Sequence, residues 1–370
     1  MHECAECTTT LEPWEGQPAP RLYGFTAKQI ATALVAVAGG SSYRAAAAAV
    51  RSSAGRELRT VRRVGSSGKT LPAPNEHGQL VSDWVQVFTP MIWQAYAPSS
   101  WPQLLVLDED EFRFASAGSA RGKLAFVVLA AVGYLPSGKP FVAAIEAVPR
   151  VNVPAWRAFL SRLSGTPTRV VTDGGLARKA AQRVWPEPDQ PAPQLWRCEW
   201  HLARNITTSL PDNVQRDPTD EIHPLIAAAQ TSPAGWTALL AHVSRRAAPG
   251  GYHATTKTLT SLDELVRRQT AARANTGPYS SGAVEQFFRH LDATLGDRAA
   301  RLTNKARADA LLQLLAAHRN GWANQQAWAD LIRENLLTRQ GRAPQQRQCS
   351  NPAHPSSLRT PRPAPAIVDF

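Results

Sequence analysis

The chain has 370 residues and 43% of them are hydrophobic, so it is long enough for two or three folded domains and too apolar for general disorder. Its 41 Lys and Arg residues exceed the 29 Asp and Glu residues, which gives a formal charge of +12. Most of the basic residues are Arg, whose planar guanidinium suits phosphate recognition. We therefore expect nucleic acid as a partner, although a solvated basic surface without a polyanion is the alternative.

The sequence predicts no membrane association. The longest apolar run, at 126–135, is too short to span a bilayer, and Gly133 within it favours a strand. No basic start followed by an apolar stretch marks a secretory signal at the N-terminus. Four cysteines are too few for a disulfide framework at this length. We expect a cytoplasmic, nucleoid-associated protein without a membrane partner.

Residues 1–20 are polar and rich in Pro, and they contain Cys4 and Cys7 in a C-x-x-C pattern. This pattern is half of a zinc knuckle. His2, or Cys349 with His354, could complete a Zn²⁺ site. We expect instead that the segment is a degenerate remnant without a complete zinc site.

The sequence pattern of residues 21–65 predicts two short helices. Thr26 is suited to cap the first helix, the pair Gly39 and Gly40 interrupts it, and the second begins at Tyr43. Two helices joined by a tight Gly-containing turn resemble a helix-turn-helix, and a helical hairpin that serves only packing is an equal alternative. The basic residues that follow favour DNA binding. The residues expected to contact DNA in this segment are Arg44, Arg51, Arg62 and Arg63.

A linker at 66–80 separates these helices from a predicted α/β domain at 81–325. The expected order after a helix from about residue 80, which Pro90 ends or kinks, is three strands, helix, strand, helix, strand and helix. The strands end at Asp108, near 135, near 148, at Thr172 and near 200. Residues 211–275 predict a helical insertion, and the stretch 326–370 predicts a last helix with a disordered basic tail from Thr338.

Two acidic residues close apolar strands, and a third lies far downstream on a helix. Asp108 follows four apolar residues, Asp173 follows Val170-Val171-Thr172, and Glu285 lies on an amphipathic helix. Strand alternation puts Asp108 and Asp110 on one face and Glu109 on the other. A strand-end or helix-cap role is the simpler interpretation of each acid alone. If the three converge, they need a divalent metal, and paired metals are the usual means of cutting phosphodiesters.

These stretches resemble the DDE transposases of the Mutator-like kind found in bacterial insertion sequences, which have a ribonuclease H-like core. The resemblance covers roughly residues 100–325. It includes Leu105-Val106-Leu107-Asp108, Val170-Val171-Thr172-Asp173-Gly174 and the acid Glu285 in Gly282-Ala283-Val284-Glu285-Gln286-Phe287-Phe288-Arg289. Its most specific part is the C-x-x-H stretch Cys198-Glu199-Trp200-His201, followed by Leu202-Ala203-Arg204-Asn205.

The resemblance implies that Asp108, Asp173 and Glu285 are catalytic and hold two Mg²⁺ or Mn²⁺ ions. It implies nicking of element ends and joining of those ends to target DNA, with double-stranded DNA as partner and a homodimer or higher assembly in the synaptic complex. It places Cys198 and His201 beside the site as positioning or structural residues and not as metal ligands. His201, Arg204 and Asn205 are expected to meet phosphate at a helix start.

Further basic residues near the C-terminus of the predicted domain, including Arg298 and Lys305, are also expected to contact phosphate, with a solvated helical face as the alternative. The tryptophans at 196, 200, 236, 322 and 328 are expected in the core. The sequence thus predicts a transposase with a ribonuclease H-like mixed sheet, a helical insertion and a preceding helix-turn-helix domain. Two alternatives remain: a decayed or domesticated copy that only binds DNA, and a structure-selective nuclease such as a junction resolvase.

Overall fold

The computed structural model describes residues 25–53, 78–116, 119–185, 191–247, 251–273, 279–295, 302 and 304–346, together with short strand pieces at 2–3, 10–11, 21–22, 63–64 and 70–71. The described residues divide into two compact units. The first contains those up to Tyr96 and those from Ala306 onward, and the second is Ala97–Lys305. The division differs from the expected boundary at residue 81, because the helix that starts there belongs to the first unit.

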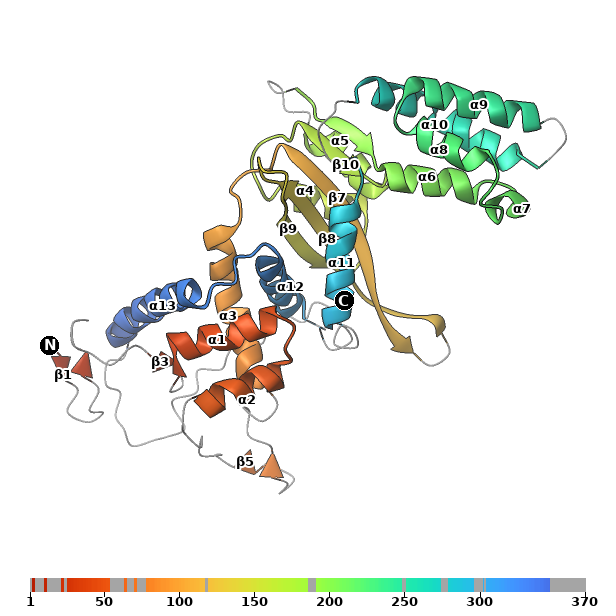
Figure 1. Ribbon diagram of the computed structural model, residues 1–370. Helices are drawn as coiled ribbons and strands as arrows, with labels where there is room; N and C mark the ends of the chain where they lie inside the picture. The colour runs from red at the N-terminus through yellow and green to blue at the C-terminus, as the bar shows by residue number, and fades with distance from the viewer. Residues whose placement is uncertain are drawn as a thin grey trace. The chain divides into compact units, whose positions relative to one another are not determined.

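The first unit is built from helices α1 (Ala27–Ala38), α2 (Tyr43–Ser53), α3 (Gln79–Tyr96), α12 (Lys305–Arg319) and α13 (Gln325–Gln346) (Figure 1). Thr26 caps α1 as predicted, because its hydroxyl accepts a bond from the Gln29 N–H while the Gln29 side chain accepts one from the Thr26 N–H. The predicted break also holds, since Gly39 is the C-cap and Gly40 has a φ of 96°. Three two-stranded pairs accompany the helices among the described residues: β1 (His2–Glu3) with β2 (Thr10–Leu11), β3 (Arg21–Leu22) with β4 (Phe25–Thr26), and β5 (Arg63–Val64) with β6 (Thr70–Leu71).

Helix α1 packs against α2, α3 and α13, so the N-terminal and C-terminal segments share one core. Two details differ from the sequence expectation. Pro90 lies inside α3 and does not end it, because the apolar spacing continues from Phe88 to Ile92 and both side chains are fully buried. The last helix does not stop before Thr338 but continues to Gln346. None of the helices in the described parts of the chain has the length and apolar character needed to cross a membrane.

A mixed five-stranded sheet forms the centre of the second unit, in the order β11-β10-β7-β8-β9. The strands are β7 (Leu104–Ser116), β8 (Ser119–Tyr134), β9 (Pro140–Val148), β10 (Arg169–Thr172) and β11 (Gln194–Arg197). Strands β7, β8 and β9 are joined as antiparallel hairpins, whereas β10 runs parallel to β7 and β11 runs parallel to β10. The chain is therefore an α/β protein, as the apolar strand runs predicted.

The two faces of the sheet are covered by different helices. Leu105, Leu107 and Leu129 share a buried cluster with Trp156 of α4 (Val153–Leu160) and Ala180 of α5 (Leu176–Val184). On the other face, α11 (Gly282–Leu295) packs against β7 and β8 (Figure 1). Because strand side chains alternate, this second face is the one that carries Asp108.

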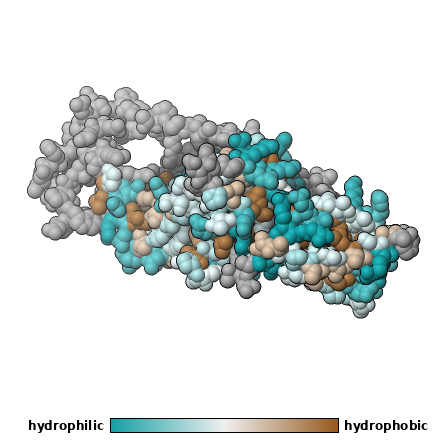
Figure 2. Space-filling model, turned by 90° about the horizontal axis from the view of Figure 1, so that it is seen from above, coloured by the Kyte–Doolittle hydropathy of each residue, from teal (hydrophilic) through white to brown (hydrophobic). Residues whose placement is uncertain are grey.

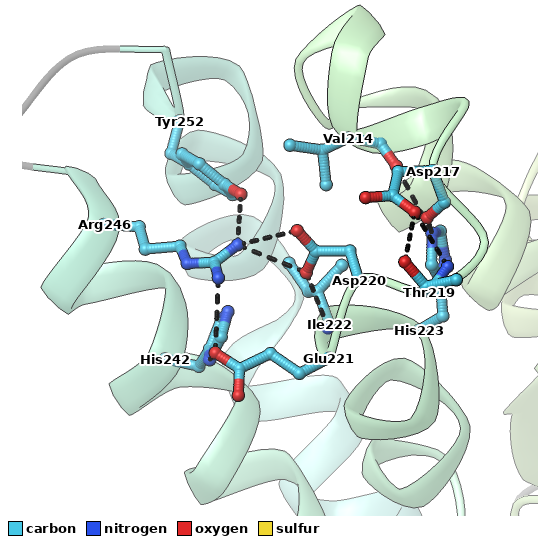
Figure 3. A network of polar contacts seen from close by, with 10 residues as sticks. All are labelled: Val214, Asp217, Thr219, Asp220, Glu221, Ile222, His223, His242, Arg246 and Tyr252. Atoms are coloured by element: carbon cyan, nitrogen blue, oxygen red, sulfur yellow. Dashed lines mark hydrogen bonds and ion pairs between the residues drawn. The ribbon is translucent and has the colours of Figure 1, made fainter.

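The predicted helical insertion is present and has its own core. Helices α7 (Asp212–Gln215), α8 (Ile222–Ala229), α9 (Pro233–Ala247) and α10 (His253–Ala271) lie within the predicted range 211–275. Helix α6 (Glu199–Thr208), predicted as a separate helix before this range, packs into the same core. Apolar residues of all five helices form its core, with Trp236 fully buried at the centre. At one end, the Arg246 guanidinium of α9 donates to both carboxylate oxygens of Asp220 and to the Tyr252 hydroxyl (Figure 3). This network joins the start of α8 to α9 and α10.

Close packing of α8 on α9 depends on Gly235, because a Cβ atom at this position would lie 2.2 Å from the Ala228 carbonyl oxygen. We expect Gly235→Ala to lower the free energy of unfolding by about 1–3 kcal/mol, because the two helix backbones have to separate. Urea denaturation of the full chain measures this change. Ala238→Ser, at an exposed position of the same helix, should stay within about 0.5 kcal/mol of wild type. Equal stability of Gly235→Ala and wild type would contradict the close packing.

Candidate functional site

Asp108 lies in the middle of β7 on the face that α11 covers, and its exposed fraction is only 9%. Its Oδ1 accepts the Glu109 N–H at 3.0 Å. Burial, with a smaller contribution from the negative charge of Asp173, raises the pKa of this carboxyl to about 8, although His201 acts in the opposite direction. The fold thus holds an acidic group where its charged form is poorly solvated.

Glu285 comes from the first turn of α11, where the partial positive charge of the helix N-terminus favours a carboxylate. Its backbone N–H donates to the Ser281 carbonyl, and its Oε1 accepts a hydrogen bond from the Ser281 hydroxyl at 2.5 Å. Glu285 is therefore oriented by the residue that precedes its helix.

His201 lies in the first turn of α6 and completes a group of three potential metal ligands. One ligand atom each from Asp108, His201 and Glu285 lie within 4.8 Å of one another. The three residues come from β7, α6 and α11, which are far apart in the sequence. The resemblance implied that His201 is not a ligand, but a ring nitrogen of its imidazole lies within 4.8 Å of a carboxylate oxygen of each acid.

Asp173 follows β10, the strand beside β7, and is not a member of this three-residue group. Val171 of β10 pairs with Val106 of β7. If this register continues for two more residues along both strands, Asp173 lies opposite Asp108. The Asp173 Oδ1 accepts the Gly175 N–H at 2.7 Å, and the carboxylate is close enough to raise the pKa of both Asp108 and Glu109. The second predicted acid therefore lies at the same end of the sheet, at the margin of the group.

Arg197, at the end of β11, is a basic neighbour of Asp173 that the sequence did not single out. Burial lowers the pKa of its guanidinium, whereas the charge of Asp173 acts in the opposite direction. A Cβ atom on Gly174 would lie 2.8 Å from the Arg197 Nη1, and Gly174 has a φ of 91°. The glycine after Asp173 thus serves both the left-handed turn and the close approach of Arg197.

Glu109 and Asp110, the two acids that follow Asp108 on β7, lie on the faces that strand alternation predicted. Glu109 lies on the opposite face, where its Oε2 accepts the Trp156 Nε1–H at 2.9 Å. Burial, with the charge of Asp173, raises its pKa to about 7. Asp110 shares the face of Asp108 but lies beside Asp292 of α11, and burial together with that charge raises its pKa to about 6.

The C-x-x-H stretch connects the start of α6 to the start of α11 through Ser281. The Ser281 N–H donates to the Cys198 Sγ at 3.2 Å, and the Ser281 Oγ lies 3.3 Å from both that sulfur and the His201 Nδ1. Cys198 is fully buried. Burial would raise its pKa, but hydrogen bonds from His201 and Ser281 outweigh that effect and lower it, while the bond to Cys198 raises the pKa of His201. Cys198 and His201 therefore lie beside the acids, where the resemblance put them.

The predicted DNA-contacting residues have varied surroundings. Arg204 and Asn205 are exposed on α6, and Arg44 is exposed on α2. Lys305 is engaged with the protein itself, because its Nζ contacts the Glu146 Oε1 at 2.6 Å and the Ala147 carbonyl at 2.7 Å. The remaining predicted DNA-contacting and zinc-binding groups lie outside the described part of the chain. They are the side chains of Arg51 and Arg63, and the whole of Arg62, Arg298, Cys4 and Cys7.

No protein-family model matches the chain, and a comparison with the curated proteins finds no match either. The chemistry of the site therefore has to be inferred from its own residues and their geometry.

Ser281 is the shared hydrogen-bonding partner at this site, so its hydroxyl should contribute measurably to stability. We expect Ser281→Ala to lower the free energy of unfolding by about 1–3 kcal/mol, because Glu285 loses a donor and Cys198 loses a buried partner. Denaturant unfolding of the full chain measures the loss. The neighbouring Ser280→Ala is the matched control and should change it by no more than about 0.5 kcal/mol. Equal effects of the two substitutions would contradict the central position of Ser281.

The raised pKa of Asp108 also predicts how stability depends on pH in the absence of divalent cations. Below about pH 4 the carboxyl is protonated in both the folded and the unfolded chain. Between about pH 4 and 8 the unfolded chain releases the proton more readily, so this group lowers folded stability as pH rises. Asp108→Asn should remove this contribution and unfold at a higher urea concentration than wild type at pH 8 in EDTA, with a gain on the order of 1 kcal/mol. Parallel pH profiles for the two proteins would contradict the expectation.

Proposed function

We propose that the chain is a metal-dependent DNA strand-cleaving and strand-joining enzyme, a DDE-type transposase. The observation that carries the proposal is the convergence of Asp108 and Glu285, with His201, from three separate elements. Asp173 follows the adjacent parallel strand at the same end of the sheet. Acids gathered where their charge is poorly solvated are typical of catalytic sites that bind cations.

The topology supports a ribonuclease H-like core. In the second unit the antiparallel strands β7, β8 and β9 come first, and β10 and β11, which run parallel to β7, extend the sheet on the other side of β7. Asp108 lies on the first strand and Asp173 follows the fourth, which is the placement that the resemblance implies for the first two acids. The helical insertion between Asp173 and Glu285, with a core of its own, is a second feature in keeping with this class.

The donor set fits a divalent cation. Two carboxylates and one imidazole suit Mn²⁺, and the carboxylates alone suit Mg²⁺, which prefers oxygen. Burial raises the pKa of Asp108, so its carboxylate form is poorly solvated by the protein, and a bound cation would stabilise that form. Bound there, one or two such ions would supply Lewis-acid stabilisation and an activated water or DNA 3′-hydroxyl. Asp108 and Glu285 would hold the cations, Asp173 would complete the site, and Ser281 would fix the Glu285 carboxylate.

DNA as the substrate is supported by the net charge of +12 and by the exposed Arg204 and Asn205 on α6, the helix that carries His201. We assign recognition of element ends to the helix pair α1 and α2, which pack together and expose Arg44 near the start of α2. Two such ends have to be held together for joining, which would require at least a homodimer.

The proposal predicts the outcome of a cleavage and strand-transfer assay on the DNA that flanks this gene, with Mg²⁺ or Mn²⁺. Wild type should nick the element end and join it to target DNA. Asp108→Asn and Glu285→Gln should each reduce the rates of both reactions by at least about 100-fold. Loss of a direct metal ligand lowers activity more than loss of a residue that only hydrogen-bonds to a ligand. Asp110→Asn is the matched control on the same strand face and should retain activity.

Three results would contradict this function. Wild type that binds the ends but never cuts them, with either cation, would identify a DNA-binding protein that lacks catalysis. Undiminished cutting by Asp108→Asn would place the chemistry elsewhere. Cutting of branched DNA without any joining would indicate a structure-selective nuclease.

A further inference from the structure

Trp200 is exposed at the surface beside the candidate active site. The sequence predicts a core position for it, but 48% of the residue is exposed, whereas Trp196, Trp236 and Trp328 are at most 2% exposed. Among the described residues, the other exposed large hydrophobic side chains are aliphatic: Val87, Leu135 and Leu337. The exposed ring of a tryptophan is a large flat apolar surface on which the π-face of a ligand can stack.

The neighbours of Trp200 on α6 are polar and cationic. The Arg204 guanidinium carbon lies 5.3 Å from the centre of the Trp200 ring, one helical turn further along. The ring of His201 meets that of Trp200 edge to face, with the centres 4.8 Å apart. Because His201 belongs to the potential metal-ligand group, the Trp200 ring lies directly beside the proposed reaction centre.

We propose that Trp200 and Arg204 form a subsite that binds an unpaired nucleobase next to the phosphate that is cut. The inference rests on the proposed function and adds to it a binding site for a particular part of the substrate. In duplex DNA the base faces are covered by their neighbours, so only an extruded or single-stranded base can stack on an aromatic side chain. Stacking on Trp200 would cover its ring, and the Arg204 charge would attract the adjoining phosphate.

The surroundings favour a nucleobase over an apolar protein partner. The contacts of the Trp200 ring are with Arg204, one turn along α6, and with His201, so the groups around this single exposed aromatic ring are polar. On the molecular face shown in Figure 2, hydrophobic residues likewise lie in small groups between hydrophilic ones. A protein interface would instead bury a broader apolar patch.

The first experiment measures binding without cleavage and therefore does not depend on the proposed reaction. A single-stranded oligonucleotide carrying 2-aminopurine is titrated with the full chain in EDTA. Wild type should quench the fluorescence by stacking, Trp200→Phe should largely retain the quenching, and Trp200→Ala should bind about 10-fold more weakly or worse. Leu135→Ala, at a residue that is 44% exposed in the same unit, is the control and should match wild type. Equal quenching by Trp200→Ala and wild type would overturn the subsite.

The second experiment uses single-turnover cleavage of the element end, either fully paired or with mismatched nucleotides beside the cut. Trp200→Ala should cut the paired end at least about 10-fold more slowly than wild type, and mismatches should restore much of the rate, since unpairing no longer depends on the stacking site. Wild type and Trp200→Ala should bind Mn²⁺ with the same affinity. Weakened Mn²⁺ binding in Trp200→Ala would overturn the subsite, because Trp200 would then act through His201. If wild type cuts neither substrate, the proposed function fails, and quenching in EDTA still decides the subsite.

Discussion

The burial of Asp108 beside Glu285 is the constraint on which the rest of the second unit depends. A carboxyl on a central strand is costly when a helix covers it, and its raised pKa, about 8, reflects that cost. The sheet tolerates it because Leu105 and Leu107, on the opposite face of the same strand, pack into the large cluster under α4 and α5. The apolar packing on one face of β7 thus stabilises the strand, and this offsets the cost of burying a potential metal ligand on its other face.

The grouping of the three potential metal ligands also requires that the N-termini of α6 and α11 lie close together, although the two helices are more than 70 residues apart in the sequence. Hydrogen bonds around Ser281 join Cys198 and His201 of the α6 start to Glu285 of α11. The Glu199 N–H also donates to the Tyr279 carbonyl, and Glu199 forms an ion pair with Arg273, which follows the C-cap of α10. Helices α7 to α10, which lie between these points in the sequence, can therefore extend the chain without displacing His201 or Glu285.

The sequence predicted the parts of this arrangement that follow local rules. Apolar runs identified β7 and β10, alternation separated Glu109 from Asp108, and Thr26 identified a helix start. The predicted end of the first strand at Asp108 is wrong, because β7 continues through its acidic residues to Ser116 and pairs with β8 over that length. Features that depend on long-range contact were not predictable in this way. The partnership of Ser281 with Cys198, the approach of Arg197 to Gly174 and the exposure of Trp200 all arise from packing between distant segments. No local pattern distinguishes an exposed tryptophan from a buried one on a short helix.

The central claim is that Asp108 and Glu285 together hold a divalent cation. Mn²⁺ titration followed by electron paramagnetic resonance tests it most directly, because the free ion gives a strong signal that broadens on binding. The account predicts that wild type binds Mn²⁺ near neutral pH, that Asp108→Asn and Glu285→Gln lose this binding, and that Asp110→Asn retains it. Wild-type binding that survives both of the first two substitutions would contradict the account, as would a wild-type protein that binds no Mn²⁺.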